Sequence, residues 1–252
     1  MSLDHSQRYG MFTSSEIGNL CTSDKKGGFG KPALSYIEKK VYESRLGRRI
    51  QNETTSKSMS WGRAMELFSF QKLGIEYVLT SDLTIKNKDI ENWVGSPDGY
   101  KEKDSVLTVF DIKCPYLLQY CRLADMCISG DVQKFKEEEP IYFWQLVSGS
   151  ILTGATHGEL VITIPYRDEL HQLKGIIDKI NSEDAYEYYW IEAALNSGKF
   201  DQLPHIIRDT YYHNLYTLNF KIEQSDIDFL TERVIMANEI RKNWGVPEIK
   251  KS

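Results

Sequence analysis

The most informative part of the chain reads Gly95-Ser96-Pro97-Asp98-Gly99 and then Val106-Leu107-Thr108-Val109-Phe110-Asp111-Ile112-Lys113-Cys114-Pro115. The run from Val106 to Phe110 is β-branched and apolar, so it predicts a buried strand. Pro115 cannot continue a sheet ladder and ends that strand. Side chains alternate along a strand, so Asp111 and Lys113 lie on the same face. The segment therefore predicts a buried strand that carries an acid and a lysine side by side.

A second acid, Asp98, stands thirteen positions before Asp111. Two carboxylates on neighbouring strands can hold a hard divalent cation, and a nearby lysine can orient or deprotonate a water molecule. This layout is typical of a metal-dependent phosphodiesterase, in which two cations about 3.5–4 Å apart stabilise the phosphoryl and leaving oxygens. Taken singly, Asp111 and Lys113 are also explained as a surface ion pair. Asp98 is likewise explained as the turn residue of Pro97-Asp98-Gly99.

Hydrophobic periodicity and turn residues predict an α/β chain. The predicted helices span residues 59–73, 117–126, 141–152, 186–195 and 226–244, and the predicted strands span 76–80, 93–100, 106–113, 159–165 and 216–222. Residues 1–60 are expected to be helical with loops. No linker rich in Pro, Gly or Ser and no internal repeat divides the chain. We therefore expect a single domain over residues 1–252, with a core at about 8–165 and a mostly helical elaboration at 166–252.

Composition and charge exclude several classes of protein. The chain has 252 residues, 27% of them charged, and a net charge of −5, so it is neither generally disordered nor a broadly basic nucleic-acid coat. No apolar run approaches the roughly 18 residues of a membrane span. The N-terminal segment Met1-Ser2-Leu3-Asp4-His5 lacks the apolar core of a signal peptide. We therefore expect a cytoplasmic protein with no membrane segment.

The cysteines, Cys21, Cys114, Cys121 and Cys127, raise the question of an iron–sulfur cluster. Some nucleases with an Asp…Asp-x-Lys layout carry such a cluster, held by one early cysteine and three near the C-terminal end. Here the last 125 residues contain no cysteine, and no Cys-x-x-Cys pair occurs. We expect reduced thiols and no iron–sulfur cluster.

Five short motifs in one order extend the signal beyond a lone Asp-x-Lys. They are Arg8-x-Gly10-x-x-Thr13-x-Ser15, Gly62-x-x-x-Glu66, Gly95-Ser96-Pro97-Asp98-Gly99, Asp111-Ile112-Lys113-Cys114-Pro115 and Tyr142-x-x-Gln145. With them the chain resembles the PD-(D/E)xK nuclease superfamily and, more narrowly, the phage λ exonuclease and YqaJ-like viral recombinase family. The resemblance runs from about Arg8 to Pro165, roughly two thirds of the chain.

This resemblance implies a restriction-endonuclease-like fold, in which a mixed central β-sheet carries the site and helices flank it. It implies the catalytic residues Glu66, Asp98, Asp111, Lys113 and Gln145, and the metal ligands Asp98, Asp111, Glu66 and the backbone carbonyl of Ile112. The implied cofactor is Mg²⁺, with Mn²⁺ as a substitute. Lys113 would orient or activate the attacking water, and Gln145 would help to position the lysine or the water.

The resemblance also implies a pocket for the 5′-phosphate of DNA, formed by Arg8, Ser15 and Ser96. Arginine makes bidentate, charge-assisted bonds to phosphate, and hydroxyl groups add neutral donors. A second arginine is expected about two turns after Lys113, where this chain has Gln119; Arg122 is the alternative. Outside the resemblance, Ser15 is equally well explained as a helix cap and Arg8 as a solvated charge.

The function that the resemblance implies is a Mg²⁺-dependent DNA exonuclease. It would act on one strand of duplex DNA, 5′→3′, in phage-type recombination and leave a 3′ single strand for an annealing protein. A ring-shaped homotrimer would hold DNA despite the net charge of −5. The alternatives are another nuclease of the superfamily, namely an endonuclease, a resolvase or a Cas4-like enzyme, and a non-catalytic DNA-binding module. The intact acid-acid-lysine set favours an enzyme over the module.

Overall fold

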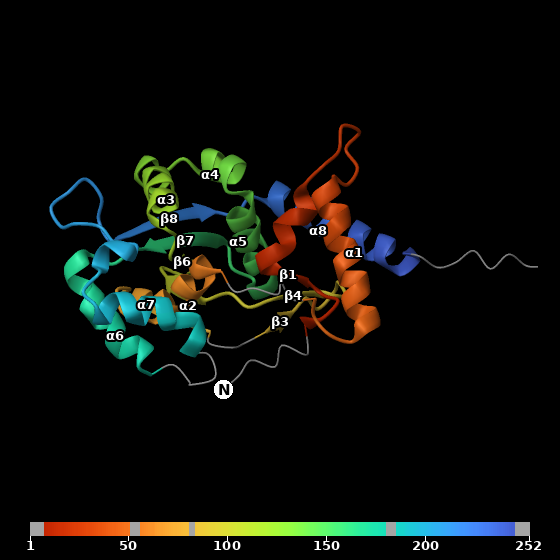
Figure 1. Ribbon diagram of the computed structural model, residues 1–252. Helices are drawn as coiled ribbons and strands as arrows, with labels where there is room; N and C mark the ends of the chain where they lie inside the picture. The colour runs from red at the N-terminus through yellow and green to blue at the C-terminus, as the bar shows by residue number, and fades with distance from the viewer. Residues whose placement is uncertain (1–7, 51–55, 81–83, 180–184, 245–252) are drawn as a thin grey trace, which may run out of the picture.

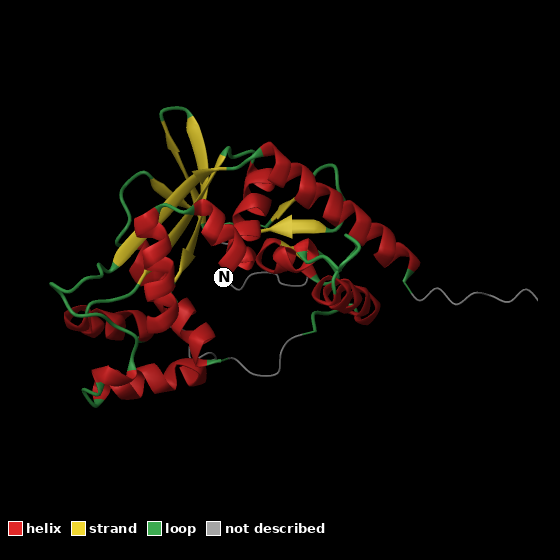
Figure 2. Ribbon diagram, turned by 90° about the horizontal axis from the view of Figure 1, so that it is seen from above, coloured by secondary structure: helices red, strands yellow, loops and turns green. Residues whose placement is uncertain are grey.

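The computed structural model of the protein describes residues 8–50, 56–80, 84–179 and 185–244 (Figure 1). Its strands form a five-stranded sheet in the order β2-β5-β6-β7-β8 and a three-stranded sheet in the order β1-β4-β3. Helices lie on both sides of the strands (Figure 2). The predicted α/β class, with a mixed sheet flanked by helices, is confirmed.

The elements follow the predicted order along the chain. The strands are β1 (Phe12–Thr13), β2 (Tyr77–Leu79), β3 (Ile85–Lys86), β4 (Trp93–Gly95), β5 (Gly99–Lys103), β6 (Val106–Lys113), β7 (His157–Thr163) and β8 (Leu215–Lys221). The α-helices are α1 (Lys31–Leu46), α2 (Lys57–Phe70), α3 (Leu117–Ser129), α4 (Val132–Glu138), α5 (Pro140–Thr153), α6 (Leu170–Ile177), α7 (Ala185–Asn196) and α8 (Gln224–Asn243). The 3₁₀ helices are η2 (Ser14–Cys21), η3 (Arg167–Glu169) and η4 (Phe200–Gln202). Each predicted helix and strand has a counterpart within a few residues, except the strand over 93–100.

β6 occupies the centre of the larger sheet, antiparallel to β5 and parallel to β7. Its apolar residues Phe110 and Ile112 are buried on one face, together with Val161 of β7. The other face meets α5, where a β-carbon at Gly149 would come within 3.2 Å of the Val109 side chain. Glycine at this position therefore lets α5 lie directly on β6. The same close approach brings α5 over the end of the strand that carries the acid and the lysine.

The predicted strand over residues 93–100 is wrong in one respect, because it is two strands, β4 and β5, in different sheets. Pro97 lies between them and has no N–H to donate to a ladder. Its carbonyl accepts a hydrogen bond from the Thr80 hydroxyl instead, and the Asp98 carbonyl accepts from the Thr80 N–H at 3.1 Å. The chain therefore crosses between the sheets at residues 96–98, so Ser96 and Asp98 lie outside both ladders.

The segment after residue 166 completes the packing of the first part of the chain. β8 pairs antiparallel with β7, and α8 packs against α1 and α5 (Figure 1). α6 and α7 pack on α2 around the buried side chains of Trp61, Phe68 and Ile191. From this packing we propose that the chain forms one domain. No helix in the described part of the chain is long and apolar enough to cross a membrane.

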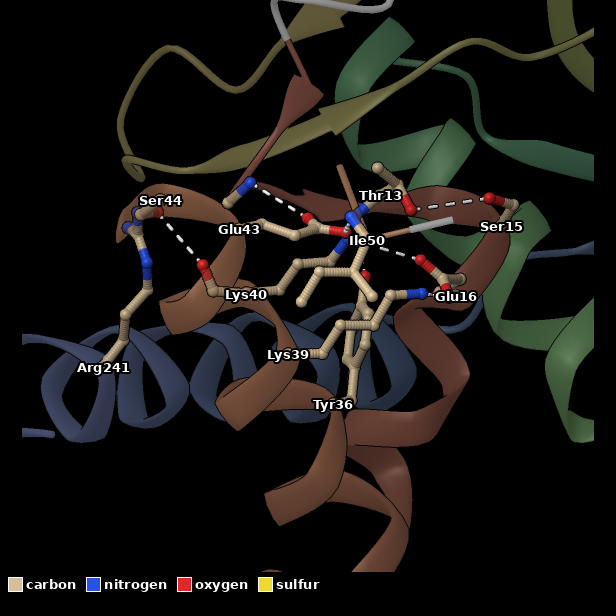
Figure 3. A network of polar contacts seen from close by, with 11 residues as sticks. Thr13, Ser15, Glu16, Tyr36, Lys39, Lys40, Glu43, Ser44, Ile50 and Arg241 are labelled. Atoms are coloured by element: carbon tan, nitrogen blue, oxygen red, sulfur yellow. Dashed lines mark hydrogen bonds and ion pairs between the residues drawn. The ribbon is translucent and has the colours of Figure 1, made fainter. Parts of the chain in front are cut away.

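α1 presents a buried polar network to the segment that follows Arg8 (Figure 3). The Glu43 carboxylate is fully buried and accepts hydrogen bonds from the Gly10 N–H at 3.0 Å and the Ile50 N–H at 3.2 Å. Lys40, also fully buried, donates to the same carboxylate at 3.0 Å. One buried acid thus satisfies two backbone groups and one ammonium group, and it fixes the backbone close to Arg8.

Glu43→Ala is expected to lower the free energy of unfolding by about 3 kcal/mol, because it leaves Lys40 short of a partner and the Gly10 N–H without its acceptor. Urea denaturation measures the change. Glu38→Ala is the matched control on the same helix, because the Glu38 carboxylate accepts from the exposed Tyr42 hydroxyl; it should cost less than about 0.5 kcal/mol. A loss below about 1 kcal/mol for Glu43→Ala would mean that the network contributes little.

Candidate active site

One cavity of about 910 Å³ brings the predicted site residues together. Its lining includes Arg8, Ser15, Glu66, Ser96, Asp98, Asp111, Ile112, Lys113 and Gln145. These residues come from the N-terminal segment, α2, the crossing between β4 and β5, the end of β6, and α5. Segments that lie far apart in the sequence therefore meet at one opening beside the central strand.

Asp111 and Lys113 are in direct contact on one face of β6. Asp111 is only 3% exposed, and its Oδ2 forms an ion pair with Lys113 Nζ. Gln145 of α5 bridges the two, because its Nε2 donates to Asp111 Oδ1 at 2.5 Å and its Oε1 accepts from Lys113 Nζ at 3.3 Å. Asp98 reaches the same strand, where its Oδ2 accepts from the Ile112 N–H at 2.6 Å. Asp111, Lys113 and Gln145 thus form one hydrogen-bonded group, and Asp98 is bonded to the strand backbone between the acid and the lysine.

The charges of this group shift its protonation equilibria. Burial and the nearby Asp111 carboxylate raise the pKa of Asp98 to about 8, although Lys113 opposes the shift. Burial acts to lower the pKa of Lys113, but the Asp111 and Asp98 carboxylates outweigh it, so the net shift is upward. The two carboxylates lie close together and are poorly solvated, so they repel each other, and a bound cation would relieve that repulsion.

Lys113 has a further partner that the sequence reasoning did not assign. Its Nζ lies 5.1 Å from the centre of the Tyr142 ring, within the range of a cation–π contact. Gln119 Nε2 donates to the Tyr142 hydroxyl at 3.3 Å. Tyr142 precedes Gln145 by one helical turn, so the Tyr-x-x-Gln spacing places both side chains over the lysine. That spacing was the signal by which Tyr142 could have been assigned.

Glu66 lines the cavity but stands apart from the two aspartates. The side chains that α2 buries in the core are those of Trp61, Met65 and Phe68. Glu66 lies on the opposite face of the helix and is exposed. Its charge still contributes to the raised pKa of Asp98. Within the described residues, no three Asp, Glu, His or Cys side chains are close enough to form a metal-binding group.

The donor set nevertheless fits a hard divalent cation. Asp111 Oδ2 is buried, and the Lys113 ammonium is its partner among the described contacts. Mg²⁺ usually retains several water ligands and is bound through one or two carboxylates. Asp98, Asp111 and Ile112 line the same cavity, so two carboxylates and a backbone carbonyl would be available for such a partial shell, and Glu66, which also lines it, would bind through water.

A second cluster of polar groups surrounds Arg8. Its Nη2 donates to Ser96 Oγ at 2.5 Å, and its Nε and Nη2 donate to Thr84 Oγ1 at 3.1 and 2.8 Å. Ser15 lines the same cavity, and its Oγ lies 3.5 Å from Thr13 Oγ1. Ser15 is not the cap of η2: that position belongs to Thr13, whose side chain makes no capping bond. The explanation of Ser15 as a helix cap is therefore wrong.

The sequence left open whether Gln119 or Arg122 faces the predicted phosphate pocket. Gln119 lines the cavity, and Arg122 is not among the described lining residues. Arg122 instead lies near Glu139, where burial raises the pKa of the carboxyl and the charge of Arg122 only partly opposes that shift. Sequence reasoning missed Thr84, which belongs to no motif and immediately precedes β3, a strand too short to show periodicity.

Comparison with known proteins places the chain in a family. A model of the YqaJ-like viral recombinase domain matches residues 5–156. The chain belongs to the YqaJ-like viral recombinase family. The resemblance deduced from the motifs is therefore confirmed. A search of curated proteins found no match.

Solved structures show where else this fold occurs. LHK-Exo in complex with dAMP has a TM-score of 0.62 and 14% identity, over 95% of this chain and 91% of that chain. LHK-Exo is an alkaline exonuclease from Laribacter hongkongensis, and a second structure of it gives a TM-score of 0.61. A phage-related exonuclease from Haemophilus somnus 129PT has a TM-score of 0.58 and 15% identity, over 92% of this chain and 94% of that chain. At this identity the likeness establishes the fold.

Proposed function

We propose that this member of the YqaJ-like family is a Mg²⁺-dependent DNA exonuclease that degrades one strand of duplex DNA in the 5′→3′ direction. Family and fold support a phage-type DNA exonuclease. One observation carries the proposal for this chain: Asp111, Lys113 and Gln145 are bonded to one another at the wall of a large open cavity, and Asp98 is bonded to the Ile112 backbone between them. The activity would belong to the cytoplasm of a bacterium or a phage-infected cell.

Asp98, Asp111 and the Ile112 carbonyl would hold Mg²⁺, and Glu66 would bind it through water. Mn²⁺ has similar ligand preferences and would substitute. When bound, the cation stabilises negative charge on the phosphoryl oxygens and lowers the pKa of a water ligand.

The chain's own residues orient the reaction. Lys113 Nζ lies beside Asp111 and within 3.3 Å of Gln145, so it can hold an attacking water next to the carboxylates. Gln145 contacts both Lys113 and Asp111, and it would hold the two side chains in place when the scissile phosphate enters. The Tyr142 ring, whose centre lies 5.1 Å from Lys113 Nζ, would limit the motion of the ammonium group.

The cluster around Arg8 supports the 5′→3′ polarity. A guanidinium and hydroxyl groups are suited to a terminal phosphate, and Arg8, Ser15 and Ser96 line the same cavity as the acids. A 5′-phosphate held there would place the first phosphodiester of that strand near Lys113. LHK-Exo was solved with dAMP, which is the class of product that stepwise cleavage releases.

An end-labelled duplex tests the proposal directly. With a duplex that is phosphorylated and labelled at only one 5′ end, incubation with Mg²⁺ should release label as mononucleotides and leave the complementary strand intact, and EDTA should abolish the release. Label released as long internal fragments would instead indicate an endonuclease or a resolvase. Binding without cleavage in either Mg²⁺ or Mn²⁺ would indicate a DNA-binding module.

Arg8→Ala is expected to reduce the preference for a 5′-phosphorylated duplex over a 5′-hydroxyl duplex by about tenfold or more, because a hydrogen bond to a charged group contributes roughly 1.5–3 kcal/mol. The measurement is kcat/KM on both duplexes. Arg48→Ala is the control on an exposed arginine of the same N-terminal region. If wild-type protein degrades both duplexes at the same rate, the pocket does not recognise a 5′-phosphate.

We propose further that the enzyme forms a ring-shaped homotrimer and hands its 3′ single strand to an annealing protein. A protein of net charge −5 holds DNA weakly as a monomer, and a ring would retain the duplex without a strongly basic surface. Light scattering should give about three times the 29.2 kDa chain mass. With DNA in excess, fully digested and untouched molecules should coexist. A monomer that digests all molecules gradually would contradict the ring.

A further inference from the structure

Thr84 binds the guanidinium of Arg8 from outside the described cavity lining. Its Oγ1 accepts hydrogen bonds from Arg8 Nε at 3.1 Å and Nη2 at 2.8 Å, and from Ser96 Oγ at 3.3 Å. Arg8 Nη2 also donates to Ser96 Oγ at 2.5 Å. Arg8 and Ser96 line the cavity, whereas Thr84 is not among the described residues that do so. The three side chains therefore form a closed triangle with two corners at the cavity wall.

The pairing of β3 with β4 fixes the positions of Thr84 and Ser96. β3 and β4 are antiparallel, and Ile85 pairs with Gly95. Thr84 and Ser96 are the next residues outward from this pair, so the backbone register brings them opposite each other. A guanidinium is planar, with its N–H groups in a rigid fork. Because Thr84 holds the edge formed by Nε and Nη2, it also sets the direction of the whole Arg8 group.

The orientation of Arg8 matters because the cavity is not rich in available positive charge. Arg63 also lines it, but its Nη1 forms an ion pair with Glu187 at 2.7 Å. Gln119 occupies the position where the resemblance implied a second arginine. An arginine held in one orientation loses less side-chain entropy when it binds an anion.

We propose that Thr84 is a positioning residue that presents Arg8 and Ser96 as one anion-binding unit, and that it thereby sets the preference for a 5′-phosphorylated DNA end. This rests on the proposed function, because the terminal phosphate of the substrate is the anion that the unit would take. Thr84 acts through Arg8 and Ser96 and does not touch the substrate.

Two substitutions at Thr84 separate the hydroxyl from the shape of the side chain. Thr84→Val keeps the branched shape and removes the acceptor, and Thr84→Ser keeps the acceptor. Thr84→Val should lower the ratio of kcat/KM for 5′-phosphorylated over 5′-hydroxyl duplex by about tenfold, mainly through KM for the phosphorylated duplex. Thr84→Ser should restore the ratio to within about twofold of wild type.

Thr80→Val is the matched control. The Thr80 hydroxyl bonds to the Pro97 carbonyl, and Thr80 is not among the described residues of the cavity lining. This substitution can lower stability, but the ratio of the two duplexes should stay at its wild-type value. A purely structural role for Thr84 would lower the rates on both duplexes together and leave the ratio unchanged.

A binding measurement makes the test independent of turnover. Fluorescence anisotropy in EDTA gives the ratio of dissociation constants for the two duplexes, and Thr84→Val should lower that ratio as well. A Thr84→Val protein that keeps the wild-type ratio in both measurements overturns the proposal, as does a Thr84→Ser protein that loses it. If the wild-type protein degrades DNA but shows no preference in either measurement, the cavity does not recognise a 5′-phosphate. If the wild-type protein binds phosphorylated ends more tightly but never cleaves DNA, the proposed exonuclease activity is wrong. The binding ratios of the Thr84 variants then still decide the role of Thr84.

Discussion

Lys113→Ala is expected to lower the rate of DNA cleavage by about 10³-fold, within the range for loss of a group that moves or orients a proton. The Lys113 Nζ forms an ion pair with Asp111, lies 3.3 Å from Gln145 Oε1 and lies 5.1 Å from the centre of the Tyr142 ring. Without it, the attacking water would lose its positioning group, and Gln145 would lose one of its two partners.

The fold should survive this substitution. The Lys113 side chain is 21% exposed and borders the cavity, so its removal creates no void inside the core. Lys103→Ala is the matched control, because Lys103 is an exposed strand lysine at the far end of β5. Cleavage of end-labelled duplex measures activity, and urea denaturation checks the fold. Near-wild-type turnover by a folded Lys113→Ala protein would remove Lys113 from the catalytic residues.

The sequence was sufficient to predict the central strand and the grouping of Asp111, Lys113 and Gln145 at its end. β6 begins and ends where the run of Val, Leu, Thr and Phe and the following Pro115 predicted. The helices that carry Glu66 and Gln145 were predicted because apolar residues recur at helical spacing. The family motifs then indicated which polar residues on these elements face one another. Local pattern and motif order together therefore located the cavity.

Other features depend on contacts that no local pattern encodes. The two-residue strands β1 and β3 are too short to show a period of two, so the smaller sheet was missed. The split of residues 93–100 into β4 and β5 follows from Pro97 and from its contact with Thr80. Thr84 lies 76 positions from Arg8 along the chain, and only the pairing of β3 with β4 brings it to Arg8.

Buried charge was equally hard to foresee. Lys40 and Glu43 belong to a helix whose charged residues would ordinarily be solvated, yet both are fully buried. Their burial depends on the backbone groups of Gly10 and Ile50, which the fold places against α1. The positions of charges on an amphipathic helix indicate which face is polar, but they do not indicate which other segment covers that face.

Asp98→Ala is expected to remove both cleavage and measurable metal binding. Asp98 and Asp111 are the two carboxylates beside Lys113, and a site with two carboxylate ligands loses half of its formal negative charge when one is deleted. Calorimetric titration with Mn²⁺ measures the affinity without DNA. Asp98→Asn is the more conservative variant, because an amide oxygen can still accept from the Ile112 N–H that Asp98 Oδ2 now binds at 2.6 Å.

The two variants distinguish loss of charge from loss of structure. If Asp98 binds metal, both should fail to bind Mn²⁺, whereas Asp98→Asn should unfold at nearly the urea concentration of wild type. Asp228→Ala, on the exposed face of α8, should leave the Mn²⁺ affinity unchanged. Unchanged Mn²⁺ affinity in a folded Asp98→Asn protein would show that the cation does not require Asp98. Asp111 and Glu66 would then have to hold it, although the described structure does not group three such side chains.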